Sequence, residues 1–285
     1  MQVRYINPFT DFGFKKLFGE EESKPLLMDF LNQLLPLTSP IISLEYRNLE
    51  QLGLTAYDRK AVFDIYCIDE LGRHFIVEMQ KAHQNFFKDR AVFYSTFPIQ
   101  RQAEKGKWDF RLEAVYCVGL LDFVFEEEED KVEYFHEVNL KNQRNEVFYE
   151  KLTFFFIEMP KFEKAEAELA SGLEQWLYCL KHLEEFERIP SSLDAPIFQR
   201  FFEQAELAKL SQEERECYEE SLKVYRDLHN VIETARLEGK EEGRLEVQEE
   251  TALKLFRKGF NLEEISELTG LSEPELLKLR TSHPN

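Results

Sequence analysis

The stretch AVFDIYCIDELGRHFIVEMQ (61–80) decides the fold, because it has the clearest β-hairpin pattern in the chain. Its two halves, AVFDIYCI and HFIVEMQ (74–80), are rich in β-branched and aromatic residues and flank a turn-like DELGR segment. If the loop is Glu70-Leu71-Gly72, with Gly72 in the left-handed conformation, the hairpin register is centred on Leu71. Residues equally far from Leu71 then face each other across the two strands.

Asp64 and Glu78 are such a pair, so their β-carbons are expected about 5 Å apart. Like charges directly opposite each other destabilise a sheet unless a cation lies between them or one carboxyl is protonated. Hard carboxylate oxygens suit Mg²⁺ or Mn²⁺. Glu78 and Gln80 are two residues apart and share a face of the strand. Asp64 and Glu78 are either members of a metal site or solvent-facing residues of a one-sided sheet, and apolar neighbours of the same parity, such as Ile76, favour the site.

The charge of the whole chain narrows its possible partners. The 285 residues contain 36 Lys+Arg and 55 Asp+Glu, a formal net charge of −19. This excess argues against general nucleic-acid binding, which needs clustered Lys and Arg, but is compatible with a local basic groove or a metal-bridged phosphate contact. The hydrophobic content of 43%, with 26 Phe and 11 Tyr, is sufficient for a large core and excludes a wholly disordered chain.

The sequence also predicts the cellular environment. No run of about 18 apolar residues is present, so we expect no membrane span. The start, MQVRYINPFTDFGF, lacks the basic and apolar regions of a secretory signal. The 4 cysteines form no CxxC pair, which argues against a zinc site or a disulfide framework and fits a reducing compartment. We therefore expect a cytoplasmic protein.

Around the hairpin, residues 1–160 combine helix and strand signals. Two helices are expected before the hairpin, one through FGFKKLF, capped by Thr10 or Asp11, and one capped by Ser23. A further helix is expected from Phe86 to Lys105, interrupted or kinked at Pro98. Strands are expected at 41–49, 114–125, 132–140 and 151–159. The pattern predicts an α/β core with a mixed β-sheet flanked by helices.

After Pro160 the chain becomes helical and highly charged, so we expect an all-helical C-terminal region. We divide it into a helical region with a charged linker (161–250) and a small helix-turn-helix-like module (251–285). The capping box SQEE (211–214) opens a long helix to about Leu237. The following LEGKEEGRLEVQEE is either a solvated helix or a linker, because its two glycines each weaken a helix by about 1 kcal/mol.

Several motifs in this order resemble the PD-(D/E)XK nuclease superfamily, and within it the recombination-promoting nucleases and putative transposases of the Rpn type. The resemblance covers NPFTDFGFKKLFGEE near the start, RKAVFDIYCIDELGRHFIVEMQ, and FKDRAVFYSTFPIQRQAEKG after the hairpin. It extends to ARLEGKEEGRLE and the GF-LEEIS-LTGLS module at the end. It implies a restriction-endonuclease-like core at 1–160, a metal-dependent DNA endonuclease activity with Mg²⁺ or Mn²⁺, and a role in recombination or transposition.

The resemblance also implies roles for individual residues. Asp64 and Glu78 correspond to the metal ligands, and Asp11 corresponds to an acidic position in the first helix that completes the site. Asp11 is alternatively an N-cap. Gln80 stands where the superfamily usually has Lys. An amide cannot accept a proton from water, so Gln80 can only orient the attacking water by hydrogen bonds.

Three further residues are candidates for contacts with substrate phosphate. Lys60 shares the parity of Asp64 and is either a source of positive charge or a lysine on the rim of the sheet. Arg90 and Tyr94 are four residues apart on the expected helix and share a face. They either clamp a phosphate or form a surface salt bridge and a packed aromatic.

Two functions from different classes remain open on the sequence. The first is a DNA endonuclease that hydrolyses phosphodiester bonds. The second is a catalytically weak or inactive nuclease relic that acts in binding or self-assembly, as a possible homo-oligomer through its C-terminal helices. In the module, the second helix begins Ser272-Glu273-Pro274-Glu275, and these carboxylates disfavour DNA reading by that helix.

Overall fold

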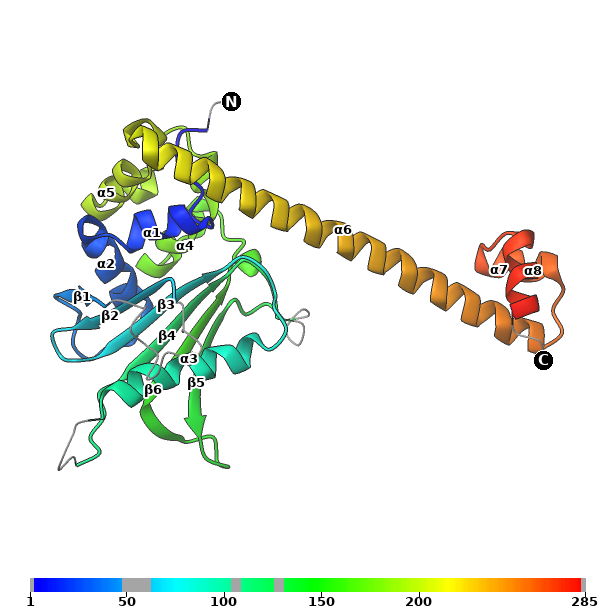
Figure 1. Ribbon diagram of the computed structural model, residues 1–285, viewed down its shortest axis with the longest axis horizontal. Coiled ribbons are helices and arrows are strands. Elements are labelled where there is room, and N and C mark those ends of the chain that lie inside the picture. The colour runs from blue at the N-terminus through cyan, green and yellow to red at the C-terminus, as the bar shows by residue number, and fades with distance from the viewer. Residues whose placement is uncertain (1–2, 48–62, 104–108, 126–130, 283–285) are drawn as a thin grey trace. The chain divides into compact units, whose positions relative to one another are not determined.

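The computed structural model describes residues 3–47, 63–103, 109–125 and 131–282. They form a mixed six-stranded sheet with helices packed against it, followed by a long C-terminal helical region, so the chain is α/β as predicted (Figure 1). The strands are β1 (Leu44–Tyr46), β2 (Ile65–Asp69), β3 (His74–Gln80), β4 (Val115–Leu121), β5 (Phe135–Lys141) and β6 (Val147–Glu158). The α-helices are α1 (Asp11–Phe18), α2 (Lys24–Leu34), α3 (Phe87–Arg101), α4 (Gly172–His182), α5 (Pro196–Ala205), α6 (Gln212–Arg257), α7 (Leu262–Thr269) and α8 (Glu273–Ser282). Short 3₁₀ helices are η1 (Glu21–Ser23), η4 (Met159–Lys161), η5 (Glu166–Glu168), η6 (Leu183–Glu185), η7 (Ser191–Leu193) and η8 (Leu207–Lys209).

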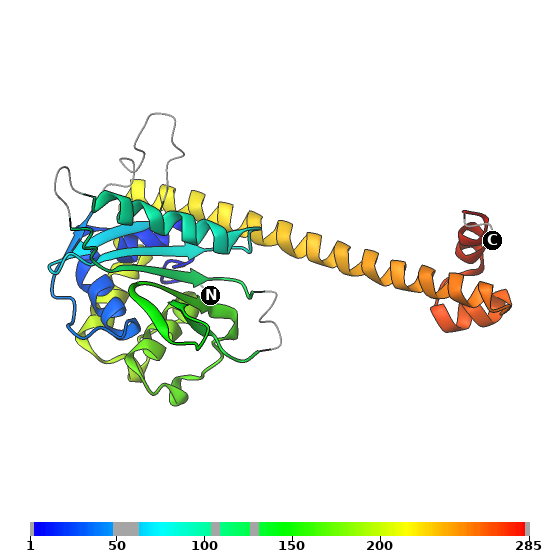
Figure 2. The same ribbon diagram turned by 90° about the horizontal axis from the view of Figure 1, so that it is seen from below.

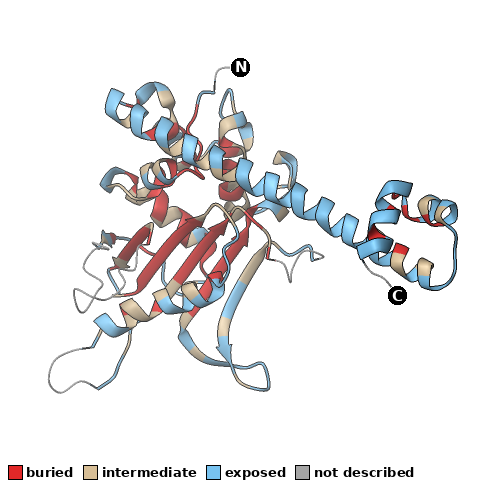
Figure 3. Ribbon diagram, turned by 45° about the vertical axis from the view of Figure 1, so that its right-hand side comes forward, coloured by how far each residue is buried: buried red, intermediate tan, exposed pale blue. Residues whose placement is uncertain are grey.

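The strand order in the sheet is β1-β2-β3-β4-β6-β5. The strands β1, β2 and β3 are antiparallel neighbours, β3, β4 and β6 are parallel neighbours, and β5 pairs antiparallel with β6. The parallel connection from β3 to β4 runs through α3, as a crossover between parallel strands requires. The middle strands are buried, whereas β5 and the start of β6 are exposed (Figure 3).

Alternating side chains of the sheet enter two separate hydrophobic cores. On one face, residues such as Val77 pack with α1, α2, α4 and α5 around Trp176, which is fully buried. On the other face, residues such as Ile76 pack against Phe87 and Tyr94 of α3. Figure 2 shows the same elements from a second direction. Since Val77 and Ile76 are adjacent on β3, the period of two in the sequence is what separates the two cores.

The predicted hairpin register is confirmed. The Cα partners across β2 and β3 include Ile65 with Val77 and Cys67 with Phe75, pairs that are equally far from residue 71. Gly72 has φ of +77°, the left-handed conformation expected of it. Its N–H donates to the carbonyl of Asp69 at 3.1 Å, which closes the turn.

The expected helices before the hairpin are present, with one change at their caps. Thr10 is the N-cap of α1, and its side chain accepts a hydrogen bond from the Gly13 N–H. Asp11 is therefore the first helical residue and not the cap. Ser23 occupies the N-cap position of α2 without a capping side-chain bond, because its hydroxyl is bonded to Glu20 instead. Pro98 lies inside α3 and does not end that helix.

The helix that begins at the SQEE capping box is longer than expected. Ser211 and Glu214 form the predicted reciprocal bonds, but α6 continues past Leu237 to Arg257. Gly239 and Gly243 lie within it with no neighbouring atom within 4 Å of where a β-carbon would be. Of the two alternatives for LEGKEEGRLEVQEE, the solvated helix is thus correct. Ion pairs one turn apart, such as Arg244 with Glu241 at 2.6 Å, support this exposed stretch.

The chain divides into two compact units, Met1–Tyr225 and Arg226–Asn285. The first turns of α6 belong to the first unit, where Tyr218 accepts a hydrogen bond from the Asn7 N–H at 2.9 Å. In the second unit, α7 and α8 form a small core with the end of α6, which contributes Ala252. Asn261 and Glu264 make a capping box at the start of α7, and Gly270, with φ of +75°, ends that helix. Among the described residues, no helix is long and apolar enough to cross a membrane.

The left-handed glycine of the hairpin provides a test of this register. We expect Gly72→Ala to lower the free energy of unfolding by about 1–2 kcal/mol, because a β-carbon is strained at this φ. Asn145 also has a positive φ, of 63°, in the β5–β6 hairpin, and Asn145→Gly should leave stability unchanged or raise it slightly. Urea denaturation of both variants measures this. Equal stability of Gly72→Ala and wild type would contradict the turn.

Candidate functional site

Asp64 and Glu78 come together where β2 begins. Glu78 lies on β3, and Asp64 directly precedes β2, at a bend in the chain. The Met79 N–H donates to Asp64 Oδ2 at 2.8 Å, which continues the pairing of the two strands through a side chain. The bend changes the direction of the residue before it. Phe63 has the strand parity of Ile65, but it packs edge-on against Tyr94 of α3, with ring centres 5.0 Å apart.

The environment of the Asp64 and Glu78 carboxylates disfavours their ionised forms. The pKa of Glu78 is raised to about 7, first by burial and then by the nearby charge of Asp64, while Arg90 opposes the rise. Burial also raises the pKa of Asp64, and the charge of Asp11 adds to that rise. The Met79 N–H and the cations of Lys15 and Lys81 oppose it. The carboxylates of Asp64 and Glu78 thus repel each other in a partly dry site.

A glycine leaves room beside Glu78. Gly119 of β4 is the Cα partner of Glu78 in the parallel register of β3 and β4. A β-carbon at Gly119 would lie 3.0 Å from a ring carbon of Phe156. Glu78 and Gly119 line a small cavity together with Ala91 and Tyr94 of α3. The space around the Glu78 carboxylate therefore depends on a residue without a side chain at this point of the sheet.

Arg90 and Tyr94 of α3 lie on the same face of the sheet as Glu78. The guanidinium carbon of Arg90 is 5.5 Å from the ring centre of Phe87 and 5.9 Å from that of Tyr94. Its Nη1 donates to Gln84, whereas its Nε and Nη2 are buried and have no hydrogen-bond partner in the described part of the chain. Buried donors without partners are costly. Arg90 thus keeps two donors available beside a carboxylate whose charge it influences.

Asp11 lies on the side of the site formed by α1. Its Oδ2 accepts from Lys15 Nζ at 3.1 Å, one turn along the helix, and its charge influences both Asp64 and Lys81. A close backbone approach fixes this helix, since a β-carbon at Gly13 would lie 2.0 Å from the carbonyl oxygen of Asn7. Asp11 is near Asp64, but its carboxylate is shared with Lys15.

The remaining predicted residues have different outcomes. Gln80 is the last residue of β3 and half-buried, and its carbonyl accepts from the Asp122 N–H at 2.8 Å. Lys60 lies outside the residues that the structure describes. Lys81 was not predicted as a site residue, although a cation directly after Gln80 was a visible signal. It lines a cleft of about 480 Å³ with Asp11 and Lys15.

The carboxylate side chains at this site are of the kind that binds a hard divalent cation. Within the described ranges, no group of three or more His, Cys, Asp or Glu side chains is close enough together to hold a metal ion. Asp64 and Glu78 nevertheless form a pair of carboxylates that are desolvated and repel each other. Such a pair gains from a cation between its members, and oxygen ligands suit Mg²⁺ or Mn²⁺.

The raised pKa of Glu78 predicts a dependence of stability on pH. Because the folded-state pKa lies near 7 and the ordinary value is 4.5, the folded chain binds more protons between these pH values, so its stability falls as pH rises through this window. Without metal, Glu78→Gln should match wild type at pH 4 and exceed its free energy of unfolding by about 1–3 kcal/mol at pH 8. Urea denaturation in EDTA measures both. The same exchange at exposed Glu203 is the control, and an equal effect at the two pH values would contradict the buried carboxylate.

Comparison with known proteins places this chain in a family. A search of curated proteins and a search of solved structures found no significant match. A family model described as PD-(D/E)XK nuclease family transposase matches residues 8–235, which include α1, the β2–β3 hairpin, the whole sheet and the first turns of α6. That family implies a nuclease with a transposition-related role. The chain belongs to the PD-(D/E)XK nuclease family transposases.

Proposed function

We propose that this protein is a Mg²⁺- or Mn²⁺-dependent DNA endonuclease that hydrolyses phosphodiester bonds in recombination or transposition. The observation that carries the proposal is the desolvated carboxylate pair of Asp64 and Glu78, next to the unpartnered buried donors of Arg90. A structural role does not account for this arrangement, because burial of two repelling carboxylates lowers stability. A cation and a phosphate supply the missing partners.

Each residue of the site has a role in this proposal. Asp64 and Glu78 would hold the metal ion, and Asp11 would join them once its carboxylate leaves Lys15. The ion, when bound, supplies a Lewis acid that lowers the pKa of water and neutralises charge on phosphate. Gln80 orients the attacking water, since an amide donates and accepts hydrogen bonds but takes no proton at neutral pH.

Arg90 and Tyr94 hold the phosphate in this proposal. The two free N–H groups of Arg90 match the non-bridging oxygens of a phosphodiester, for which a guanidinium has suitable geometry. The Tyr94 ring packs against Phe63 and limits the movement of the guanidinium above it. The alternative of a surface salt bridge has less support, because the Arg90 side chain donates a hydrogen bond to Gln84 and lies over the rings of Phe87 and Tyr94.

A plasmid-nicking assay with a titration of Mg²⁺ tests the proposed function. We expect wild type to nick supercoiled plasmid, and Glu78→Ala and Asp64→Asn to lower the rate by at least about 100-fold, because loss of a ligand removes several kcal/mol of charge stabilisation. Mg²⁺ should also raise the melting temperature of wild type but not of Asp64→Asn. Glu203→Ala, at an exposed position of α5, is the control. Wild type that neither nicks DNA nor responds to metal would leave the nuclease relic as the better description.

The C-terminal module has a different proposed role, in contacts between protein chains. Its core is formed by Ala252, Ile265, Leu271, Leu276 and Leu279. Leu268 and Leu277 remain exposed on its two helices. At the start of α8, the Glu275 carboxylate bonds the N–H and hydroxyl of Ser272, so this helix end is already occupied by an acid. Phosphate at that end would meet like charge.

Deletion of residues 251–285 tests this role. We expect the oligomeric state measured by light scattering to change and the affinity for DNA oligonucleotides to remain within about twofold, because the deleted helices present acids at their starts and few cations. A large loss of DNA affinity with no change in mass would reverse the assignment. Leu268→Ser with Leu277→Ser is the matched variant, since it changes the exposed apolar surface and keeps the length of the chain.

A further inference from the structure

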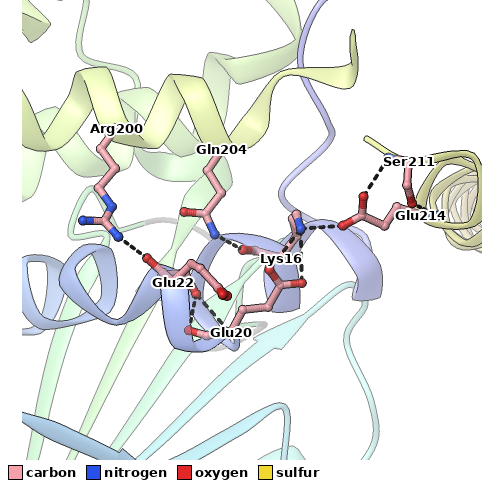
Figure 4. A network of polar contacts seen from close by, with 8 residues as sticks. Lys16, Glu20, Glu22, Arg200, Gln204, Ser211 and Glu214 are labelled. Atoms are coloured by element: carbon pink, nitrogen blue, oxygen red, sulfur yellow. Dashed lines mark hydrogen bonds and ion pairs between the residues drawn. The ribbon is translucent and has the colours of Figure 1, made fainter. Parts of the chain in front are cut away.

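Three lysines line the cleft between α1 and the first turns of α6, and two of them are neutralised by carboxylates. Lys16 Nζ lies 2.6 Å from Glu214 and 3.0 Å from Glu20, in the network of Figure 4. Lys15 Nζ lies 3.1 Å from Asp11. Lys81 has no hydrogen bond or ion pair within the described part of the chain. Of these three cations, Lys81 is therefore the one with its hydrogen-bonding capacity still available.

Of the three lysines in the cleft, Lys81 is also the one next to the candidate site along the chain. It directly follows Gln80 and is half-buried. The charges of Asp11 and Asp64 both act on its ammonium, and its own charge acts on Asp64. Arg90, by contrast, acts on Glu78 from α3. The carboxylates thus have a cation on each side, one from α3 and one from the end of β3.

The charge of the site needs more than a metal ion once DNA is present. Asp11, Asp64 and Glu78 carry up to three negative charges, and each phosphate adds another. A divalent cation offsets two of them, so further positive charge is required close by. Lys81 is partly desolvated before DNA arrives, so it loses less hydration on binding phosphate than an exposed lysine does.

We propose that Lys81 binds a phosphate of the DNA backbone beside the scissile bond, and that the cleft lined by Lys81, Lys15 and Ser221 receives that part of the strand. The ammonium exchanges the electrostatic attraction of Asp64 and Asp11 for a direct contact with phosphate when those carboxylates bind metal. The carboxylates of Asp11 and Glu20 in the cleft are paired with Lys15 and Lys16, and Glu220 is exposed on α6. This inference rests on the proposed nuclease function.

The salt dependence of DNA binding tests Lys81 apart from catalysis. Affinity of the full chain for a fluorescent DNA duplex is measured by anisotropy in Ca²⁺ over a series of KCl concentrations. We expect Lys81→Gln to weaken binding about tenfold and to reduce the slope of log K against log salt by about 0.9, the value for one lost phosphate contact. Lys81→Arg should restore both. Lys164→Gln is the matched control and should change the slope little, because Lys164 is paired with Glu174 at 2.6 Å and does not line the cleft.

Three outcomes would overturn the inference in distinguishable ways. If wild type binds and nicks DNA while Lys81→Gln keeps its affinity and salt slope, Lys81 makes no phosphate contact and the proposed function stands. If wild type neither binds nor nicks DNA, both fail together. The Mg²⁺-induced rise in melting temperature should persist in Lys81→Gln, and its loss would assign Lys81 to the folding of the site instead.

Discussion

The hydrogen bond from the Met79 N–H to Asp64 Oδ2, at 2.8 Å, is the contact on which the site depends. The hairpin register centred on residue 71 brings the start of β2 beside Glu78, but the backbone pairing ends at Ile65. The Asp64 side chain takes the place of the next backbone acceptor, and so its carboxylate is fixed against β3. A longer or shorter turn at Gly72 would shift the register and separate the two carboxylates.

The packing of the surrounding fold compensates for the destabilising effect of the Asp64–Glu78 carboxylate pair. Two hydrophobic cores cover the sheet, and the larger contains Trp176, whose Nε1 donates to Asp29 at 2.7 Å. Aromatic rings such as Phe30 and Phe201 pack against it, with centres 5.9 and 5.3 Å away. Large buried side chains each contribute a few kcal/mol, so a sheet packed on both faces tolerates a desolvated carboxylate pair at one strand end.

The parts of the structure that follow from local patterns were predictable. The bounds of β3, the hairpin register and the left-handed Gly72 all follow from alternation and turn chemistry within twenty residues of one another. The family assignment followed from motifs of the same kind, and the family model confirms it. These features depend on neighbouring residues, and a single sequence contains that information.

Other features depend on contacts between distant segments and were missed. The bend at Asp64, which turns Phe63 toward α3, results from competition between strand pairing and the Met79 hydrogen bond. Asp11 was an expected ligand, but its pairing with Lys15 depends on the side-chain conformations of α1. The length of α6 was underestimated because each glycine was considered alone, as a residue that weakens a helix. Helix propagation is cooperative, and the charged neighbours of Gly239 and Gly243 favour the helix.

A chain with an excess of acidic residues can bind DNA if its positive charge is concentrated where phosphate binds. The net charge of −19 is distributed over the chain, and charges farther apart than about 8 Å are largely screened at physiological ionic strength. At the site itself, Arg90 and Lys81 act on Glu78 and Asp64 from separate elements. Partial burial strengthens both interactions, because water screens them less. The local balance at the carboxylate pair, rather than the total charge, therefore decides whether a phosphodiester can approach it.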